Sequence, residues 1–265
     1  MNVWQATTEA PPRRRLVLWL LLWPLAWAVL QLQLLVLGLG SLAWNGVALL
    51  LYPLLPRETG RRVGRALIAH AYRAYWAFTG AVGMLKLDAA ALDTLRDERG
   101  LVIVANHPSL LDAVMLVARL PRAACIMKAS LMRNPLFGPG ARLARYIRND
   151  SAYGMVQCAV KDLHEGGQLL LFPEGTRTTR APINPLHASF AIIAKRAQVP
   201  VQVVFIDTDT PFLGKHWPLL RLPALPMHFT VRLGPRFAPP DDHLVLLGQV
   251  QACMAEGAQP PPQAR

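Results

Sequence analysis

The sequence LVIVANHPSLLD, residues 101–112, joins an apolar run to a polar motif. Its first five residues are apolar, rich in β-branched side chains and bounded by a glycine and an asparagine, which is typical of a buried strand. The residues that follow Ser109 have the spacing of a helix, with Ser109 as its N-cap. We therefore expect His107 in the loop between strand and helix, and Asp112 in the first helical turns.

In such a loop, the Asp112 carboxylate can accept the Nδ1 hydrogen of His107 and leave Nε2 ready to take a proton. This arrangement is the base half of a catalytic triad without its serine. The alternative is an ordinary loop histidine beside an aspartate that the helix dipole favours. The H-x4-D spacing is short and recurs by chance, so a second motif is needed to decide.

A second strand pattern, residues 168–172, leads directly into PEGTR, residues 173–177. If the two apolar strands lie side by side in a parallel sheet, both polar clusters open into the crevice at the carboxyl ends of the strands. This is where α/β folds bind their ligands. Glu174 and Arg177 would then face the same space as His107.

Composition narrows the classes of partner. The 265 residues carry a formal net charge of +12, and 53% of them are hydrophobic. The positive excess would suit nucleic acid, anionic lipid or an acidic carrier protein. A long run without any charged side chain, residues 16–56, favours a bilayer and excludes nucleic acid as the expected partner. The cysteines and histidines lack ligand spacing, so no metal is expected.

The N-terminal part is predicted to be a membrane anchor. Residues 1–15 form a basic leader that we expect to be disordered. Residues 16–56 would measure about 60 Å as one helix, twice the hydrocarbon thickness, so the chain must turn. Both flanks are basic, which places both ends on the cytoplasmic face, that of the inner membrane in a bacterium. We therefore predict a helical hairpin over residues 16–56, with candidate turning points at Gln31, Gln33, residues 38–41, Asn45 and Gly46.

Residues 57–256 are predicted to form one α/β domain, because strand and helix patterns alternate. The expected core is a mixed, largely parallel sheet flanked by helices. An amphipathic helix over residues 59–83 begins the domain, and a Pro-rich tail, residues 257–265, follows it. The arginines of this helix are expected to touch lipid headgroups. Its apolar positions are expected to cover the core, namely Val63, Leu67, Ala71, Tyr75, Phe78 and Val82.

The two motifs resemble the signatures of the glycerolipid acyltransferases related to 1-acylglycerol-3-phosphate acyltransferase. That family carries an N-H-x4-D block and an F-P-E-G-T-R block at a similar interval, and the resemblance covers about residues 86–233. It implies a membrane-bound enzyme with the glycerolipid acyltransferase fold. The enzyme would move a fatty acyl group from acyl-CoA or acyl carrier protein to a hydroxyl of a lysophospholipid such as 1-acylglycerol-3-phosphate. A thioester donor is already activated, so no enzyme nucleophile is needed. No cofactor is expected besides this thioester co-substrate.

The resemblance also implies residue roles. His107 would be the general base and Asp112 its orienting carboxylate, while Glu174 and Arg177 would hold the phosphate or polar head of the acceptor. The complete set of expected substrate-binding residues is Asn106, Ser109, Lys128, Arg148, Glu174, Gly175, Thr176 and Arg177.

One family block departs from its pattern. Members usually carry G-x-x-F-I-x-R, whose arginine binds glycerol phosphate, but here Asn149 stands at that position and Arg148 lies one place early. In an extended segment, this shift turns a side chain to the other face. The acceptor could then be an amino-acid lipid or a specialised polyene or aryl lipid. Two further alternatives are a lipid hydrolase using Ser109, which lacks a G-x-S-x-G elbow, and an inactive binding module.

Overall fold

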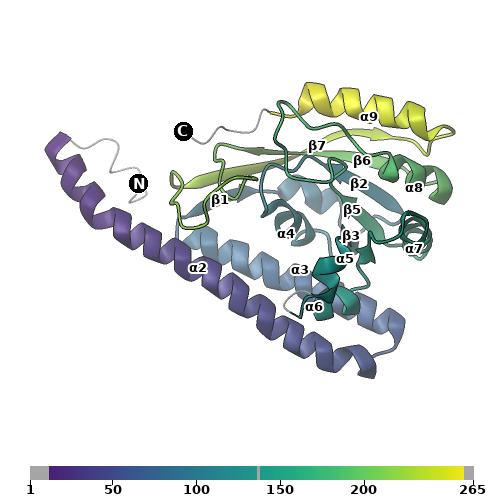
Figure 1. Cartoon of the computed structure of the whole chain (residues 1–265), viewed down its shortest axis with the longest axis horizontal. Helices are drawn as coiled ribbons and strands as arrows, with labels where there is room; N and C mark the ends of the chain where they lie inside the picture. Colours follow the sequence, from purple (N-terminus) through teal and green to yellow (C-terminus); the bar gives the residue numbers. More distant parts are fainter. Residues whose placement is uncertain (1–11, 136–137, 260–265) are drawn as a thin grey trace.

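The computed structural model describes residues 12–135 and 138–259, and shows an α/β domain beside two long N-terminal helices (Figure 1). Most of the predicted leader and tail lies outside these residues. The elements are α2 (Pro12–Leu54), α3 (Arg57–Ala81), β1 (Leu85–Asp88), η1 (Ala90–Leu95), β2 (Leu101–Ala105), α4 (Asp112–Val117), β3 (Ala123–Met127), α5 (Ala129–Arg133), α6 (Gly138–Leu143), β4 (Ile147–Arg148), α7 (Ala152–His164), β5 (Gln168–Leu171), α8 (Ser189–Ala197), β6 (Val201–Thr208), β7 (Met227–Phe237) and α9 (His243–Gly257).

In the described part of the chain, seven strands form one sheet in the order β1-β7-β6-β2-β5-β3-β4. All neighbours are parallel except β6 and β7, which confirms the predicted mixed, largely parallel sheet. The two motif strands, β2 and β5, are neighbours, with Leu101 beside Gln168. Their carboxyl ends therefore meet at the same edge, and both motif loops leave from it.

Helices cover both faces of the sheet. On one face, α7, α8 and α9 pack over Val102 and Val104 of β2. On the other, α3 and α4 pack over Ile103 and Ala105 (Figure 1). Every side chain of β2 is buried. This two-sided burial explains why the strand is a continuous apolar run rather than an alternating one.

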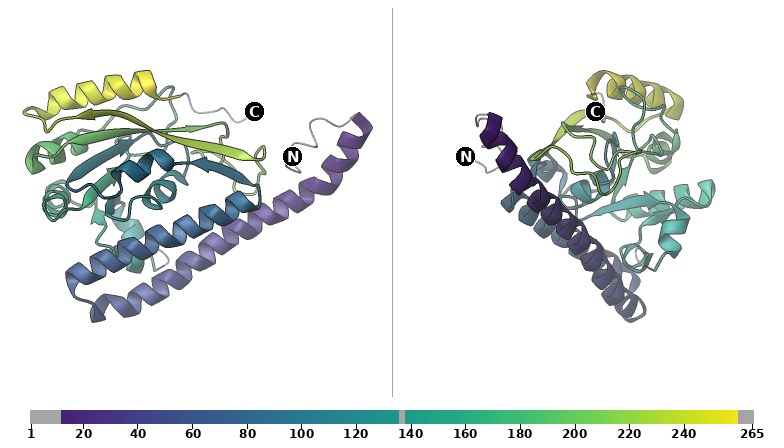
Figure 2. Two further views of the ribbon diagram at one scale, coloured as in Figure 1. Left: turned by 180° about the vertical axis from the view of Figure 1, so that it is seen from behind. Right: turned by 60° about the vertical axis from the view of Figure 1, so that its left-hand side comes forward.

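The predicted hairpin within residues 16–56 is wrong. Helix α2 runs unbroken from Pro12 to Leu54, and the chain turns only at residues 55–56, where α3 begins to run back alongside it (Figure 2). Of the positions expected to turn the chain, Gln33 and Asn45 are buried against the domain, whereas Gly38, Gly40 and Gly46 are exposed. Asn45 Oδ1 accepts a hydrogen bond from Gly140 N at 2.8 Å, and Gln33 is buried. Docking therefore gives the Asn45 side chain a hydrogen-bond partner in the domain, whereas Nε2 of Gln31 and of Gln33 is buried without a partner among the described residues.

Helix α3 buries a face that differs in most positions from the one predicted. The side buried against the domain includes Gly64, whose missing side chain lets the helix approach the backbone of Ala144. Of the apolar positions expected in the core, Tyr75 packs against it, whereas Leu67, Phe78 and Val82 are exposed by 44%, 48% and 37%. Helices α2 and α3 lie alongside each other on one side of the domain (Figure 2), and both carry exposed apolar side chains.

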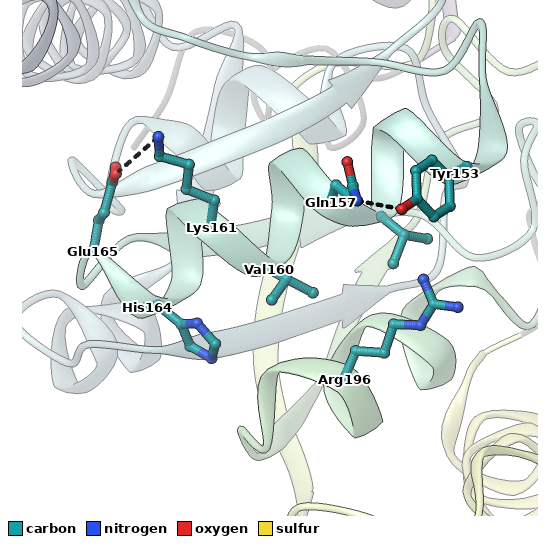
Figure 3. Close-up of a pocket in the computed structure, with 8 residues that line it drawn as sticks. Tyr153, Gln157, Val160, Lys161, His164, Glu165 and Arg196 are labelled. Atoms are coloured by element: carbon teal, nitrogen blue, oxygen red, sulfur yellow. Dashed lines mark hydrogen bonds and ion pairs between the residues drawn. The ribbon is translucent and has the colours of Figure 1, made fainter.

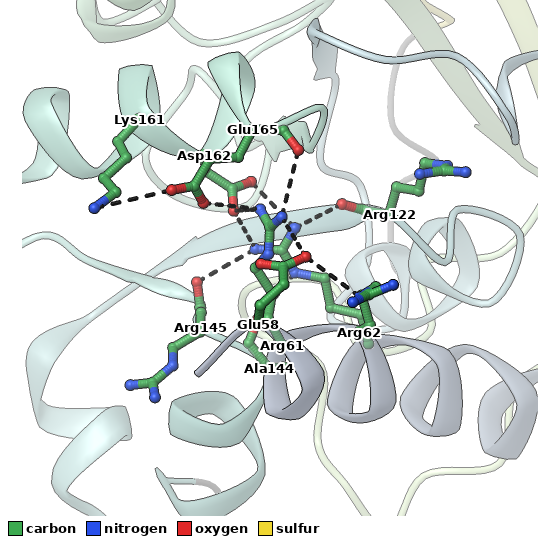
Figure 4. A network of polar contacts seen from close by, with 10 residues as sticks. Glu58, Arg61, Arg62, Arg122, Ala144, Arg145, Lys161, Asp162 and Glu165 are labelled. Atoms are coloured by element: carbon green, nitrogen blue, oxygen red, sulfur yellow. Dashed lines mark hydrogen bonds and ion pairs between the residues drawn. The ribbon is translucent and has the colours of Figure 1, made fainter. Parts of the chain in front are cut away.

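Two arginines of α3 are buried rather than presented to lipid headgroups. Arg65 donates to both oxygens of Asp162 in α7, at 2.7 and 3.1 Å, and Arg61 donates to Asp162 Oδ1 at 2.8 Å (Figure 4). Arg65 also donates to the backbone oxygens of Arg122 and Ala144. This cluster fixes α3 to the domain near the amino ends of the strands.

Candidate active site

The predicted pair of His107 and Asp112 is formed. His107 Nδ1 lies 2.9 Å from Asp112 Oδ2, and the imidazole stacks on the Phe172 ring with centroids 4.1 Å apart. A carboxylate accepts the hydrogen of Nδ1, so the neutral ring carries its lone pair on Nε2. Nε2 has no partner among the described residues, and the side chain is 16% exposed. The geometry is that of a base oriented by a carboxylate.

Asp112 has a low-dielectric environment. Its side chain is fully buried, Oδ2 also accepts from Ser109 N at 2.7 Å, and Oδ1 has no hydrogen-bond partner among the described residues. Burial raises the pKa of the Asp112 carboxyl, while the hydrogen bond from His107 acts to lower it. Because the carboxylate is poorly solvated, an imidazolium that forms beside it gains strong electrostatic stabilisation.

Glu174 lies beneath the histidine loop. It is 3% exposed, and its Oε1 accepts from His107 N at 3.1 Å and from Thr178 Oγ1 at 2.6 Å. Oε2 accepts from Asn184 N at 2.8 Å. Both oxygens are therefore occupied by protein donors. In this arrangement Glu174 holds the backbone of His107, in place of the acceptor contact expected for it.

Two other motif residues are also structural in this geometry. The Asn106 amide exchanges two hydrogen bonds with the backbone of Ile206 in β6, at 2.9 and 2.7 Å. Ser109 does not cap a helix, because α4 begins at Asp112. Its buried hydroxyl donates to Phe212 O at 2.9 Å. Neither side chain is placed to bind a substrate or, for Ser109, to attack one.

Arg177 reaches the long connection between β6 and β7, residues 209–226. Its Nη1 donates to the backbone oxygens of Leu213 and Gly214, at 2.8 and 3.0 Å. Its neighbours Gly175 and Thr176 are exposed at the edge of the site. Gly175 has φ +67°, and a Cβ there would lie 2.9 Å from the His187 ring, so the turn requires glycine.

The remaining expected residues lie at the outer part of this edge. Lys128 is exposed after β3, and Arg148 at the end of β4 is exposed and pairs with Asp150 at 2.9 Å. Asn149 Oδ1 accepts from Ala129 N at the start of α5, at 3.2 Å. Asn149, which stands where the family carries an arginine, therefore caps the start of α5.

The matches to known proteins agree with this geometry. Residues 86–207 match the family model described as Acyltransferase. These residues form an acyltransferase domain. The chain is 35% identical over 123 residues to the lyso-ornithine lipid O-acyltransferase of Pseudomonas aeruginosa, covering 42% of this chain and 47% of that one. It is 24% identical over 208 residues to the 1-acyl-sn-glycerol-3-phosphate acyltransferase of the same organism, covering 76% and 77%.

A solved structure has the same fold. The 1-acyl-sn-glycerophosphate (LPA) acyltransferase PlsC from Thermotoga maritima superposes with a TM-score of 0.64 at 20% identity, covering 87% of this chain and 93% of that one. The likeness includes regions outside the acyltransferase domain. Alignments to two of the curated relatives span only 40% and 47% of their lengths, so the chain covers about half of each.

Several residues that build the site carry no sequence signal. Thr178 and Asn184 hold Glu174, and Phe212 holds Ser109, but each comes from a segment whose approach depends on the fold. Phe172 is different, because it belongs to the second motif and follows its strand directly. Its stacking on His107 could have been inferred from adjacent strands with aligned ends.

One groove of the acyltransferase domain lies apart from these residues. A groove of about 820 Å³ between α7 and α8 is lined by Tyr153, Val156, Gln157, Val160, Lys161, His164, Glu165 and Arg196 (Figure 3). None of them belongs to the two motifs.

Among the residues that the structure describes, no group of three or more His, Cys, Asp or Glu side chains is arranged to hold a metal ion.

Proposed function

We propose that the protein transfers a fatty acyl group from a thioester, acyl-CoA or acyl carrier protein, to a hydroxyl of a lysophospholipid such as 1-acylglycerol-3-phosphate. The observation that carries this proposal is the hydrogen bond from His107 Nδ1 to Asp112, which leaves Nε2 as the free base. The buried hydroxyl of Ser109 supports direct transfer over a serine hydrolase.

The reaction requires one proton to move twice. Nε2 of His107 takes the proton of the acceptor hydroxyl while that oxygen bonds to the thioester carbonyl carbon. The carbon–sulfur bond then breaks, and the departing thiolate takes the proton back from His107. A positioned base of this kind contributes about 10² to 10⁴ in rate, and alignment of the two substrates supplies a further share.

Helix α2 supports a location at the membrane. Residues 22–54 are long and apolar enough to cross a bilayer. Many of their large side chains are exposed, for example Leu25 and Leu32 by 57% each and Leu50 by 69%. A bilayer would remove this apolar surface from water, which is favourable. We propose that the anchor holds the catalytic edge near its lipid acceptor, with the domain on the cytoplasmic face.

The test is to incubate the purified full chain in detergent with an acyl-CoA and 1-acylglycerol-3-phosphate, and to detect the diacyl product by mass spectrometry. We expect product with the native chain and almost none with His107→Ala. Hydrolysis of the thioester without a diacyl product, for every lysolipid offered, would overturn the proposal.

A second acceptor class is favoured by Asn149. Because this residue caps α5 and Arg148 pairs with Asp150, the usual phosphate-binding arginine is missing. An amino-acid lipid bearing a free hydroxyl would not require it. Competition between 1-acylglycerol-3-phosphate and lyso-ornithine lipid, with one acyl donor, separates the two candidates. The acceptor with the larger kcat/KM identifies the class.

A further inference from the structure

The connection between β6 and β7, residues 209–226, joins the catalytic loop to helix α2. At its start, the backbone oxygen of Phe212 accepts from Ser109 Oγ, and that of Leu213 accepts from Leu110 N at 3.0 Å. Further along, the oxygen of Leu220 accepts from Trp27 Nε1 of α2 at 2.8 Å. One segment therefore touches both the loop that carries His107 and the helix that we assign to the membrane.

The outer end of this connection is apolar and exposed. Leu219 and Leu220 are 58% and 66% exposed, although the same segment buries Phe212 almost completely in the core. An exposed pair of leucines is unfavourable in water and marks a contact site when it continues a larger apolar surface. Here the pair lies next to α2, to which the Trp27 hydrogen bond joins it, and Leu25 and Leu32 of that helix are also exposed.

The positive charges beside the leucine pair favour an anionic bilayer as the partner of this surface. Lys215 and Arg221 flank the leucine pair, and the Arg221 guanidinium lies 5.0 Å from the centre of the Trp217 ring. An apolar tip between cationic and aromatic side chains suits the boundary between acyl chains and anionic headgroups. The net charge of +12 favours the same partner.

We propose that residues 209–226 form a second membrane contact, in which Leu219 and Leu220 enter the surface of an anionic bilayer beside α2. This inference rests on the proposed membrane location of α2. Because Ser109, Leu110 and Arg177 bind the other end of the segment, the contact holds the His107 loop at a fixed height above the lipid. The hydroxyl of an acceptor lipid then reaches Nε2 without leaving the bilayer.

The experiment measures insertion directly and needs no turnover. In the full chain carrying Cys158→Ser and Cys253→Ser, Leu220→Cys is labelled with an environment-sensitive fluorophore. The protein is mixed with vesicles of phosphatidylcholine and phosphatidylglycerol that contain a spin-labelled quenching lipid. The matched control is Leu244→Cys on α9, a leucine exposed by 61% on the face of the sheet opposite α3.

We expect the label at position 220 to be quenched and shifted to the blue, and the label at 244 to remain as in water. Equal quenching at both positions, while the protein sediments with the vesicles, would overturn the inference and leave the acyltransferase proposal intact. Failure to sediment at all would overturn the membrane location of α2 and this inference together. Quenching at 220 without acyl transfer would support the contact and remove the proposed reaction.

As a second measurement, Leu219→Ser with Leu220→Ser should lower acyl transfer to acceptor lipids in vesicles about tenfold, the low end of what burial of one leucine contributes. The same variant should keep its rate on acceptor in detergent micelles. An unchanged ratio between vesicle and micelle rates would contradict the proposal.

Discussion

Two buried aspartates occupy opposite ends of the sheet and have different neighbours. Asp112, at the carboxyl end of β2, meets one histidine and leaves an oxygen without a partner among the described residues. Asp162, near the amino ends of the strands, receives three hydrogen bonds from Arg61 and Arg65. A carboxylate neutralised by arginines is suited to holding elements together. One that faces a titratable imidazole is suited to moving a proton.

The largest expected effect is on the catalytic side of this comparison. His107→Ala should lower kcat/KM by about 10² to 10⁴, because it removes the base, and should leave the melting temperature nearly unchanged. The matched control is His228→Ala, which removes an exposed histidine paired with Asp209 at 2.6 Å. It should keep almost full activity. Similar losses in both variants would show that the His107 pair is not special.

The second largest effect is expected at Asp162, the aspartate that holds α3 to the domain. Asp162→Asn should destabilise the folded chain by about 3 to 5 kcal/mol, because it leaves the buried Arg65 without its anion and removes one of the carboxylates that pair with Arg61. Folded molecules should keep their kcat. As a control, Asp93→Asn breaks an exposed pair with Arg119 and should cost about 0 to 1 kcal/mol. Denaturant unfolding measures both. Equal stability of the two variants would show that Asp162 does not hold the folded structure together as proposed.

A smaller loss of activity is expected for Glu174→Gln. In the native chain the Glu174 carboxylate accepts hydrogen bonds from three donors, and the variant replaces it with an uncharged amide. Loss of a charge-assisted hydrogen bond costs about 1.5 to 3 kcal/mol, so kcat should fall about ten- to a hundredfold as the His107 loop loosens. The KM for the acceptor should change little. A large rise in that KM with an unchanged kcat would instead support the acceptor-binding role that the family resemblance implies.

Ser109→Ala should have a weaker effect. The variant loses the hydrogen bond to Phe212 O, worth about 1 kcal/mol of stability, and should retain acyl transfer within a few-fold. Complete loss of activity in a folded variant would identify Ser109 as a nucleophile and revive the hydrolase alternative.

The smallest effect is expected at Arg148, whose exposed side chain pairs with Asp150. Surface pairs of this kind contribute about 0 to 1 kcal/mol, so Arg148→Ala should change the acceptor KM by less than about fivefold. Arg177→Ala is the informative comparison, because it also releases Leu213 and Gly214. Steady-state kinetics with 1-acylglycerol-3-phosphate would contradict this ranking if Arg148→Ala proved as damaging as Arg177→Ala.

The pairing of His107 with Asp112 was predictable because its signals are local. Strand β2 has the bounds that its apolar run predicts, and His107 and Asp112 are only five residues apart. The course of the N-terminal helices was not. A polar side chain such as Asn45 fits either a turn or a docked interface, and only the approach of Gly140, 95 residues away, decides between them. In the same way, the burial of Arg65 depends on Asp162.

The role of His107 as a base is tested most directly by finding which ring nitrogen carries the hydrogen. Nitrogen-15 NMR on histidine-labelled full chain in detergent, at a pH where the ring is neutral, distinguishes the two tautomers. The hydrogen bond to Asp112 predicts a hydrogen on Nδ1 and none on Nε2, and a mixture of tautomers in Asp112→Asn. A hydrogen on Nε2 of the native chain would contradict it, because that nitrogen could not then accept the proton of a lipid hydroxyl.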